Sequence, residues 1–313
     1  MRLRLAPALI ILLLCAASSA GAADKFTVLL DWFVNPDHGP LYVALEKGYF
    51  KDAGLDVELI APADPNDPPK FVAAGKGDVA VSYQPELHLQ VAGGLPIVRI
   101  GTLVATPLNC VAVLADSPVK TLADLKGKRI GYSVAGADEA VIGAMLKTVG
   151  LGLKDVTMIN VNFSLSPSLM AGQVDAVIGA YRNFELNQMA LEGRPGRCFY
   201  IEEHGVPSFD QLIFVAKRDR VDDPKLRRFI DAVERGALYL VNHPDESWTL
   251  FVKGRKDLDT ELNRRAWRDT VPRFAYAPAA LDRRRYERFA EFLKDHGLIK
   301  TVPPLDSYAV ELR

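Results

Sequence analysis

Cysteine is scarce in this sequence, with 3 residues in a chain of 313. Cys15 lies near the N-terminus, which leaves Cys110 and Cys198 for the folded protein. The spacing of cysteines and histidines does not resemble a zinc site, so we expect no metal ion. Sequence alone does not establish whether the two cysteines come within the ~5.5 Å Cα separation of a disulfide. The sequence therefore does not decide whether they form one.

An excess of either charge is also missing. The 38 Lys and Arg residues oppose 39 Asp and Glu residues, for a formal net charge of −1. Such a balance gives no electrostatic reason for a nucleic-acid partner, and we expect none. Hydrophobic residues make up 49% of the chain and charged residues 25%, which is typical of a globular protein with a sizeable core. A mature chain of about 290 residues suggests two domains.

Long apolar runs are absent after the N-terminal segment, and residues 1–23 read as a signal peptide. Two arginines form its positive region, residues 9–14 its apolar core, and residues 16–23 supply the small side chains that precede a cleavage site. The apolar core is too short to span a bilayer of ~30 Å. Because a leucine precedes Cys15, where lipoprotein processing requires a small residue, we assign Cys15 to the discarded peptide. We therefore expect a periplasmic protein.

Short β-rich runs alternate with helical patterns in two successive blocks. In the first block strands are expected at 26–30, 55–60, 78–82 and 97–104, with helices at 40–48, 71–74 and 85–92. The second block has helices at 122–125, 137–149, 167–171 and 183–191 and strands at 129–132, 156–161 and 176–180. Everything after Asp223 is predicted to be helical. This order predicts mostly parallel sheets with helices on both faces.

An internal repeat indicates where a ligand would bind. Residues 74–83 resemble residues 171–181, since each reads as a helix end, a glycine turn, an acidic residue, a buried strand and a tyrosine. Tyr83 and Tyr181 thus end two strands, at the edge of a parallel sheet where ligands bind. If the repeat is real, two lobes face each other across a cleft that forms the site. The alternative is that two unrelated α/β units look alike.

Several segments resemble the thiamine-pyrimidine family of periplasmic binding proteins. The more specific are the opening Asp31-Trp32…Asn35-Pro36-Asp37-His38 and the run Tyr181…Asn183…Glu185. Segments 77–85 and 205–210 continue the likeness. The Lys-Gly-Tyr-Phe and Leu-Lys-Gly-Lys-Arg-Ile-Gly pieces occur across sulfonate, taurine and nitrate binders too, so they support the fold only.

The resemblance implies an α/β, type II periplasmic-binding-protein fold, with two α/β lobes, a cleft between them and two crossover strands. We place the crossings near 106–110 and 209–213. Residues 24–107 plus 213–313 then form lobe 1, and 108–212 form lobe 2. The implied protein is a monomeric component of an ABC importer. It captures hydroxymethylpyrimidine or formylaminomethylpyrimidine and delivers it to the permease.

The site residues are expected to suit a flat ring that carries donors and acceptors. Aromatic side chains can cover such a ring, and a carboxylate can accept from an exocyclic amine. The expected ligand-binding residues are Trp32, Asn35, His38, Tyr83, Gln84, Tyr181, Asn183 and Glu185. Alternatives stay open: the aromatic residues could fill a core, Glu185 could be a solvated first-turn residue, and the asparagines could be caps.

Acidic residues stand where an anion binder would need donors. The turn 135–139 carries Asp138 and Glu139, the opening loop adds two further aspartates, and Arg182 is the only obvious cation nearby. This pattern argues against sulfonate, nitrate or phosphate as the ligand. Riboflavin or another flat heterocycle is the open alternative.

An enzyme is the alternative of a different class. This sequence also resembles the yeast-type pyrimidine synthase, which is expected to share the fold. That enzyme carries a cysteine cluster required for its chemistry. The aligned segment 206–211 contains no cysteine. A Ser-His-Asp or metal constellation is also missing. We therefore expect a binding protein without a cofactor.

Overall fold

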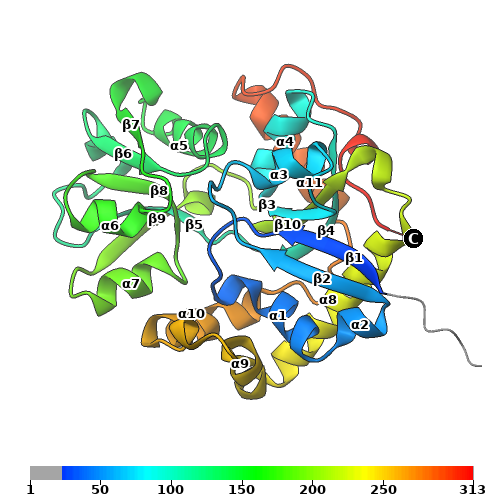
Figure 1. The fold of residues 1–313 in the computed structure, drawn as a ribbon. Helices are drawn as coiled ribbons and strands as arrows, with labels where there is room; N and C mark the ends of the chain where they lie inside the picture. Colours follow the sequence, from blue (N-terminus) through cyan, green and yellow to red (C-terminus); the bar gives the residue numbers. More distant parts are fainter. Residues whose placement is uncertain (1–22, 313) are drawn as a thin grey trace, which may run out of the picture.

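Two five-stranded sheets form the centres of two lobes in a computed structural model that describes residues 23–312 (Figure 1). The first sheet has the order β2-β1-β3-β10-β4 and the second β7-β6-β8-β5-β9. The first contains β1 (Asp24–Leu29), β2 (Leu55–Ile60), β3 (Val79–Ser82), β4 (Ile97–Val104) and β10 (Leu212–Lys217). The second contains β5 (Asn109–Leu114), β6 (Arg129–Tyr132), β7 (Thr157–Asn160), β8 (Ala176–Tyr181) and β9 (Gly196–Tyr200). The type II periplasmic-binding-protein fold is confirmed. The predicted signal peptide lies outside the described residues except for Ala23.

One strand in each sheet runs against the others. β10 pairs antiparallel with β3 and β4, and β5 pairs antiparallel with β8 and β9, while the pairs among β1, β2 and β3 and among β6, β7 and β8 are parallel. Each of these two strands is the first one after the chain crosses between lobes. Because the crossing chain enters at the edge where the parallel strands end, the entering strand has to run the opposite way.

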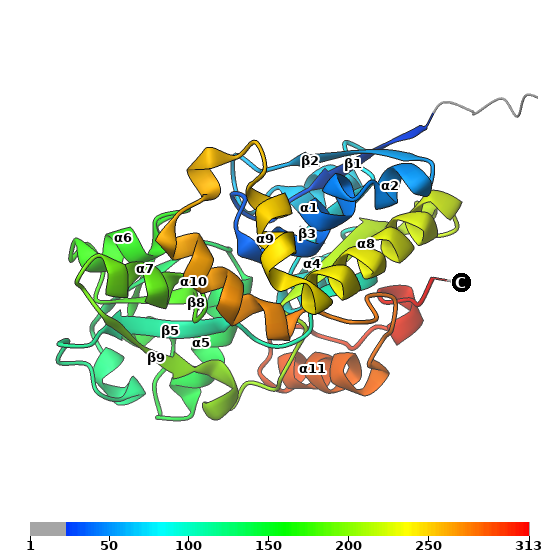
Figure 2. The ribbon, with the colours of Figure 1, turned by 90° about the horizontal axis from the view of Figure 1, so that it is seen from below.

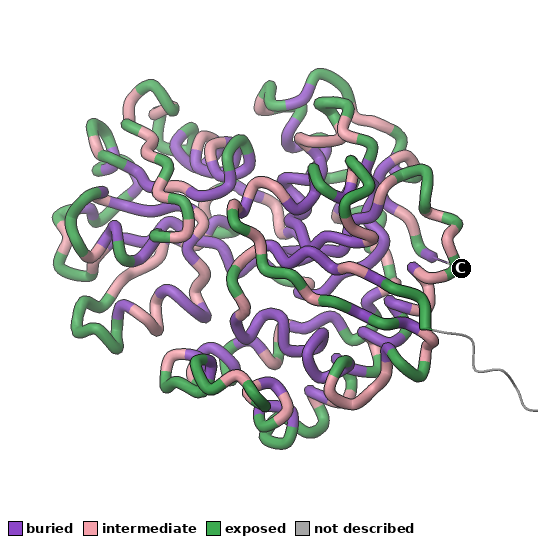
Figure 3. The backbone as a smooth tube through the Cα atoms, in the orientation of Figure 1, coloured by how far each residue is buried: buried purple, intermediate pink, exposed green. Residues whose placement is uncertain are grey.

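The helices cover both sheets. The first lobe has α1 (Gly39–Glu46), α2 (Tyr49–Asp52), α3 (Pro68–Ala73) and α4 (Gln84–Ala92), and the second has α5 (Ala137–Lys147), α6 (Leu165–Met170) and α7 (Glu185–Leu191). Residues 122–125 form a 3₁₀ turn. The buried stretches of chain follow the strands of the two sheets, whereas the outer helix faces are exposed (Figure 3).

The C-terminal region consists of α8 (Pro224–Asn242), α9 (Pro244–Val252), α10 (Glu261–Thr270) and α11 (Arg283–Asp295). α8 packs on α1 of the first lobe, and α10 lies beside α7 of the second (Figure 2). Phe289 and Phe292 of α11 share an apolar cluster with Val111 and Phe209. The prediction of helix throughout was wrong beyond α11. Gly297 adopts a φ of 72° there, and Ala309 pairs with Arg99 of β4.

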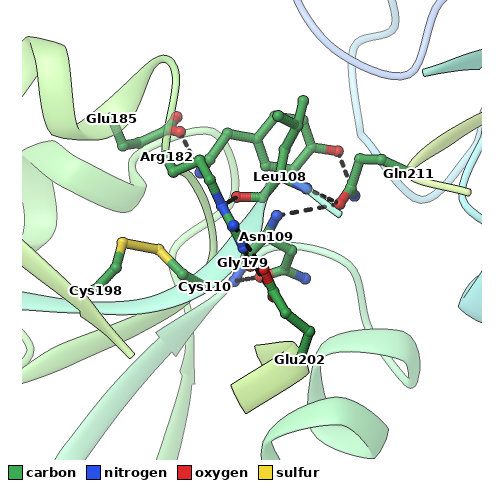
Figure 4. The surroundings of a disulfide bond; sticks show 10 residues. Leu108, Asn109, Cys110, Gly179, Arg182, Glu185, Cys198, Glu202 and Gln211 are labelled. Carbon is green, nitrogen blue, oxygen red and sulfur yellow. Dashed lines mark hydrogen bonds and ion pairs between the residues drawn. A yellow bond between two sulfur atoms is a disulfide. The ribbon is translucent and has the colours of Figure 1, made fainter. Parts of the chain in front are cut away.

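Gln211 ties the two crossover segments to each other. Its Oε1 accepts the backbone N–H groups of Leu108 at 2.8 Å and Asn109 at 3.1 Å (Figure 4). Arg182 donates to the carbonyl oxygens of the same two residues, each at 3.2 Å. Segments 105–108 and 204–211 therefore carry the chain between the sheets, close to the predicted crossings. The exact lobe boundaries stay a prediction.

A disulfide joins Cys110 on β5 to Cys198 on β9, with 5.7 Å between the Cα atoms (Figure 4). The two strands are antiparallel neighbours, which brings together residues 88 positions apart. The structure thus contains the disulfide that the sequence alone did not decide. Among residues 23–312, the helices include none of the length and apolarity needed to cross a membrane.

Candidate functional site

A cavity lies between the lobes and takes its walls from both. It sits where β1, β3, β6 and β8 end, as expected for parallel strands. The first lobe contributes Asp31, Trp32, Asn35, Asp37, Tyr83 and Pro85, and the crossover contributes Phe209 and Gln211. The second lobe contributes Asn109, Ser133, Val134, Ala137, Asp138, Val141, Leu165, Gly179, Tyr181, Phe184 and Glu185.

The three predicted aromatic residues all line this cavity. The hydroxyl of Tyr83 donates to Oδ2 of Asp31 at 2.8 Å, and the hydroxyl of Tyr181 accepts from Nε2 of Gln211 at 2.9 Å. Trp32 packs edge-to-face against Phe163, with 4.6 Å between the ring centroids. Each of the three rings therefore has a contact within the protein that positions it at the cavity wall.

His38 lies behind the cavity wall. It is fully buried, and its Nδ1 accepts the N–H of Asn35 at 3.3 Å. In the neutral ring this leaves Nε2–H to donate to Oδ1 of Asp31 at 2.9 Å. Together with the hydroxyl of Tyr83, His38 therefore fixes the carboxylate of Asp31 at the end of β1.

Gln84 and Asn183 are buried and do not line the cavity. Oε1 of Gln84 accepts the N–H of Asp210 at 2.8 Å, which anchors the returning crossover. Nδ2 of Asn183 donates to Oδ1 of Asp37 and to Oγ1 of Thr270, both at 2.7 Å. Both residues therefore hold structural elements around the site together.

Asn35 both caps a turn and lines the cavity. Its Oδ1 accepts the N–H of Asp37 at 2.8 Å, and its Nδ2 donates to the carbonyl of Phe33 at 3.1 Å. The turn that it caps, Pro36–His38, places Asp37 at the cavity wall. Asn35 therefore has both roles that the sequence allowed: it caps a turn, and it lies at the cavity wall.

Glu185 begins α7 and lines the cavity. Its Oε2 accepts the N–H of Tyr181 at 2.6 Å, and the backbone N–H of Glu185 itself also stabilises the carboxylate. Burial raises the pKa of this carboxyl to about 7, against the effect of the backbone hydrogen bonds. A carboxyl with one anchored oxygen and a pKa near neutrality can accept a hydrogen bond from an amine or share a proton with a ring nitrogen.

Two aspartates complete an acidic lining that the sequence had indicated only in outline. Burial raises the pKa of Asp138 to about 7 and that of Asp37 to about 6. The described cavity lining includes no lysine, arginine or histidine. Arg182, the nearby cation, instead pairs with Glu202 at 2.7 Å (Figure 4). The site therefore offers acceptors rather than cations.

The sequence reasoning missed several lining residues. Asp31, Asp37 and Asp138 were noted as acids but not as site residues, although their positions just beyond β1 and β6 were a usable signal. Asn109, Ser133 and Gln211 carried no comparable signal. Within the described part of the chain, His, Cys, Asp and Glu do not cluster in a way that could hold a metal ion.

Residues 35–247 match a protein-family model described as NMT1/THI5 like. The chain belongs to the NMT1/THI5-like family. A Haemophilus influenzae protein named for thiamine biosynthesis is 52% identical over 292 residues, which cover 93% of either chain. A formylaminopyrimidine-binding protein from Halalkalibacterium halodurans is 34% identical over 79% of this chain and 75% of its own length.

NMT1/THI5-like relatives also include proteins named as enzymes. A 4-amino-5-hydroxymethyl-2-methylpyrimidine phosphate synthase from Uromyces fabae is 32% identical over 78% of this chain and 74% of its own length. Among solved structures, the alkanesulfonate-binding protein from Xanthomonas axonopodis has a TM-score of 0.70 at 16% identity, covering 92% of this chain and 96% of that one. That likeness establishes the fold. The NMT1/THI5-like family includes both binding proteins and synthases. The residues that line the cavity are therefore needed to distinguish the two classes.

Proposed function

We propose that this chain is the periplasmic binding component of an ABC importer, and that it captures a thiamine pyrimidine precursor for the permease. The ligand is hydroxymethylpyrimidine or formylaminomethylpyrimidine. The observation that carries the proposal is the buried carboxyl of Glu185 in a cavity whose described lining includes aromatic rings and no cation. The formylaminopyrimidine-binding relative supports the same ligand class.

The chemistry of an aminopyrimidine suits these walls. Trp32 and Tyr181 lie on opposite lobes and supply apolar faces for a flat ring. The exocyclic amine then donates to Glu185, and the carboxyl can share a proton with a ring nitrogen. A charge-assisted contact of this kind contributes about 1.5–3 kcal/mol.

Contacts between the lobes support a capture-and-release cycle. Oδ1 of Asn66 on the first lobe accepts the N–H of Ala135 on the second at 2.8 Å, and Asn183 binds Asp37 at another point of the cleft. The two crossovers leave room for hinge motion, the usual change in this class of protein. In our proposal these contacts break when the ligand enters or leaves.

The cavity favours binding over synthesis. The part of its lining that the structure describes contains no cysteine, lysine or histidine, three of the side chains that serve as nucleophile or general base. The carboxyl groups there are anchored by backbone N–H groups and fit the role of acceptors. The relatives named as synthases make a direct test of the ligand necessary.

Calorimetry or native mass spectrometry of the purified protein with pyrimidines, riboflavin, taurine and nitrate tests the proposal. We expect saturable binding of hydroxymethylpyrimidine or its formylaminomethyl analogue and no binding of the anions. Binding of riboflavin without the pyrimidines would contradict the thiamine assignment. Binding of taurine alone would contradict the electrostatic argument as well.

Export is tested separately. N-terminal sequencing of periplasmic material should give a start between residues 21 and 24. A lipid-modified Cys15 recovered in the membrane fraction would overturn the proposal of a free periplasmic protein.

A further inference from the structure

Asp138 presents one oxygen of its carboxylate to the cavity. The residue lies in the first turn of α5, is 5% exposed and lines the cavity. Its Oδ2 accepts the backbone N–H groups of Ser133 at 3.0 Å and Val134 at 2.9 Å. Oδ1 has no hydrogen-bond partner within residues 23–312. The carboxylate is thus held in place with one acceptor to spare.

Gly179 keeps this carboxylate accessible. It lies on β8 with a φ of 92°, and a Cβ built there would stand 3.1 Å from Oδ2 and 3.3 Å from Oδ1 of Asp138. Any other residue would be strained at that φ and would crowd the carboxylate. The absent side chain leaves room for the Asp138 carboxylate beside β8, where both residues line the cavity.

The neighbouring acid has a different role. Oε2 of Glu139 accepts the N–H of Gly136 and caps α5, and Glu139 does not line the cavity. Helix N-termini are the usual binding sites for phosphate and sulfonate groups, because their free N–H groups point at the anion. Here the carboxylate of Asp138 already occupies N–H groups of this turn, and no lysine, arginine or histidine of the described lining offsets its charge.

We propose that Asp138 is a specificity-determining residue that accepts a hydrogen bond from the ligand and rejects ligands with a phosphate or sulfonate at the same place. The inference rests on the proposed function and narrows it to the unphosphorylated pyrimidine. A hydroxymethyl O–H or formylamino N–H could donate to the free oxygen, whereas a phosphate ester of the same pyrimidine would bring two charges against it.

The test compares hydroxymethylpyrimidine with its phosphate ester by calorimetry at pH 8. The unmodified protein should prefer the unphosphorylated ligand by about a hundredfold or more. This measurement needs no variant, and a ratio near one would overturn the inference. Asp138→Asn keeps an oxygen for the two backbone donors and turns the free acceptor into a donor. It should weaken binding of hydroxymethylpyrimidine by about tenfold and reduce the preference by at least about tenfold.

Glu139→Gln is the matched control, since it removes the same charge one residue away and outside the cavity. It should leave the preference within about twofold. An equal effect of both variants would mean that general electrostatics, rather than contact at Asp138, sets the selectivity. Thermal unfolding of each variant shows whether the fold is retained.

Failure of the proposed function would be visible as a separate result. If riboflavin binds and pyrimidines do not, the pyrimidine assignment fails, and riboflavin against its phosphate ester becomes the test of Asp138. If no heterocycle binds, the proposed function fails, and binding of taurine or inorganic phosphate by the unmodified protein would also overturn the role of Asp138. Their binding only after Asp138→Ser would support it.

Discussion

Nδ2 of Asn183 donates to Oδ1 of Asp37 at 2.7 Å and thereby joins the second lobe to the first at the cleft. Thr270 of α10 donates to the same oxygen at 3.0 Å. Asp37 of the opening loop is therefore bound by two residues, which lie 146 and 233 positions further along the chain. The contact is buried, so a charge introduced there is poorly screened.

Asn183→Asp should therefore hold the lobes apart at pH 8. Two carboxylates would face each other at this position, and such a like-charge pair costs several kcal/mol at an interface. We expect a larger radius of gyration by small-angle scattering and pyrimidine binding weakened by about tenfold or more. Asn242→Asp, on the exposed side of α8, is the control and should change neither quantity. An unchanged scattering profile for Asn183→Asp would show that this contact does not control closure.

Glu185→Gln should weaken pyrimidine binding by about ten- to a hundredfold, because a charge-assisted acceptor is replaced by a neutral amide. Glutamine keeps an oxygen for the N–H of Tyr181, so the start of α7 should persist. Calorimetry gives the affinity, with Glu192→Gln at the exposed end of the same helix as the control. Full affinity in Glu185→Gln would exclude Glu185 as the main acceptor.

Glu86 should make the ligand-free protein less stable as the pH rises. Burial raises the pKa of its carboxyl to about 8, so the folded state binds a proton more tightly than the unfolded state. Its stabilising contribution is present at pH values below the ordinary pKa and is lost as the pH rises through about 8. One such group changes the free energy of unfolding by at most about 1.4 kcal/mol per pH unit.

Glu86→Gln should flatten this dependence between pH 5 and pH 8, as measured by urea unfolding. The amide can still accept from the hydroxyl of Ser82, and the buried Oε1 of Gln90, which lacks a partner, can accept from the new amide after a flip of the Gln90 side chain. Asp37, Asp138 and Glu185 have raised pKa values too, so some slope should remain. A slope identical to that of the unmodified protein would contradict the role given to Glu86.

Cys198→Ser should lower the free energy of unfolding by about 2–4 kcal/mol, because the bridge to Cys110 closes a long loop in the unfolded chain. Urea unfolding of the oxidised protein, with and without reductant, measures the difference. The variant should be indifferent to reductant. If full reduction, verified by thiol titration, leaves the unmodified protein as stable as before, the bridge contributes nothing.

The local sequence was sufficient for most of the elements and for the edge at which the cavity forms, but it did not predict β5, β9 and β10. Glycine turns and apolar runs marked most of the strands, and parallel strands end at a common edge. Trp32, Tyr83, Tyr181 and Glu185 follow or end such strands, which is why they reach the cavity. The same reasoning placed His38, Gln84 and Asn183 near the edge but did not distinguish the cavity wall from the layer behind it, because a side chain's direction depends on its partners.

Those partners come from distant parts of the chain, and only the tertiary structure decided them. Asp31 is oriented by Tyr83, 52 residues away, and Gln84 holds Asp210, 126 residues away. Cys110 meets Cys198 only because β5 and β9 become neighbours in the second sheet. Periodicity along the chain determined most of the strands and helices, and with them the strand ends at which Trp32, Tyr83 and Tyr181 lie. Packing between the lobes determined which buried acids keep an oxygen free for a ligand, because hydrogen bonds from distant residues occupy the others.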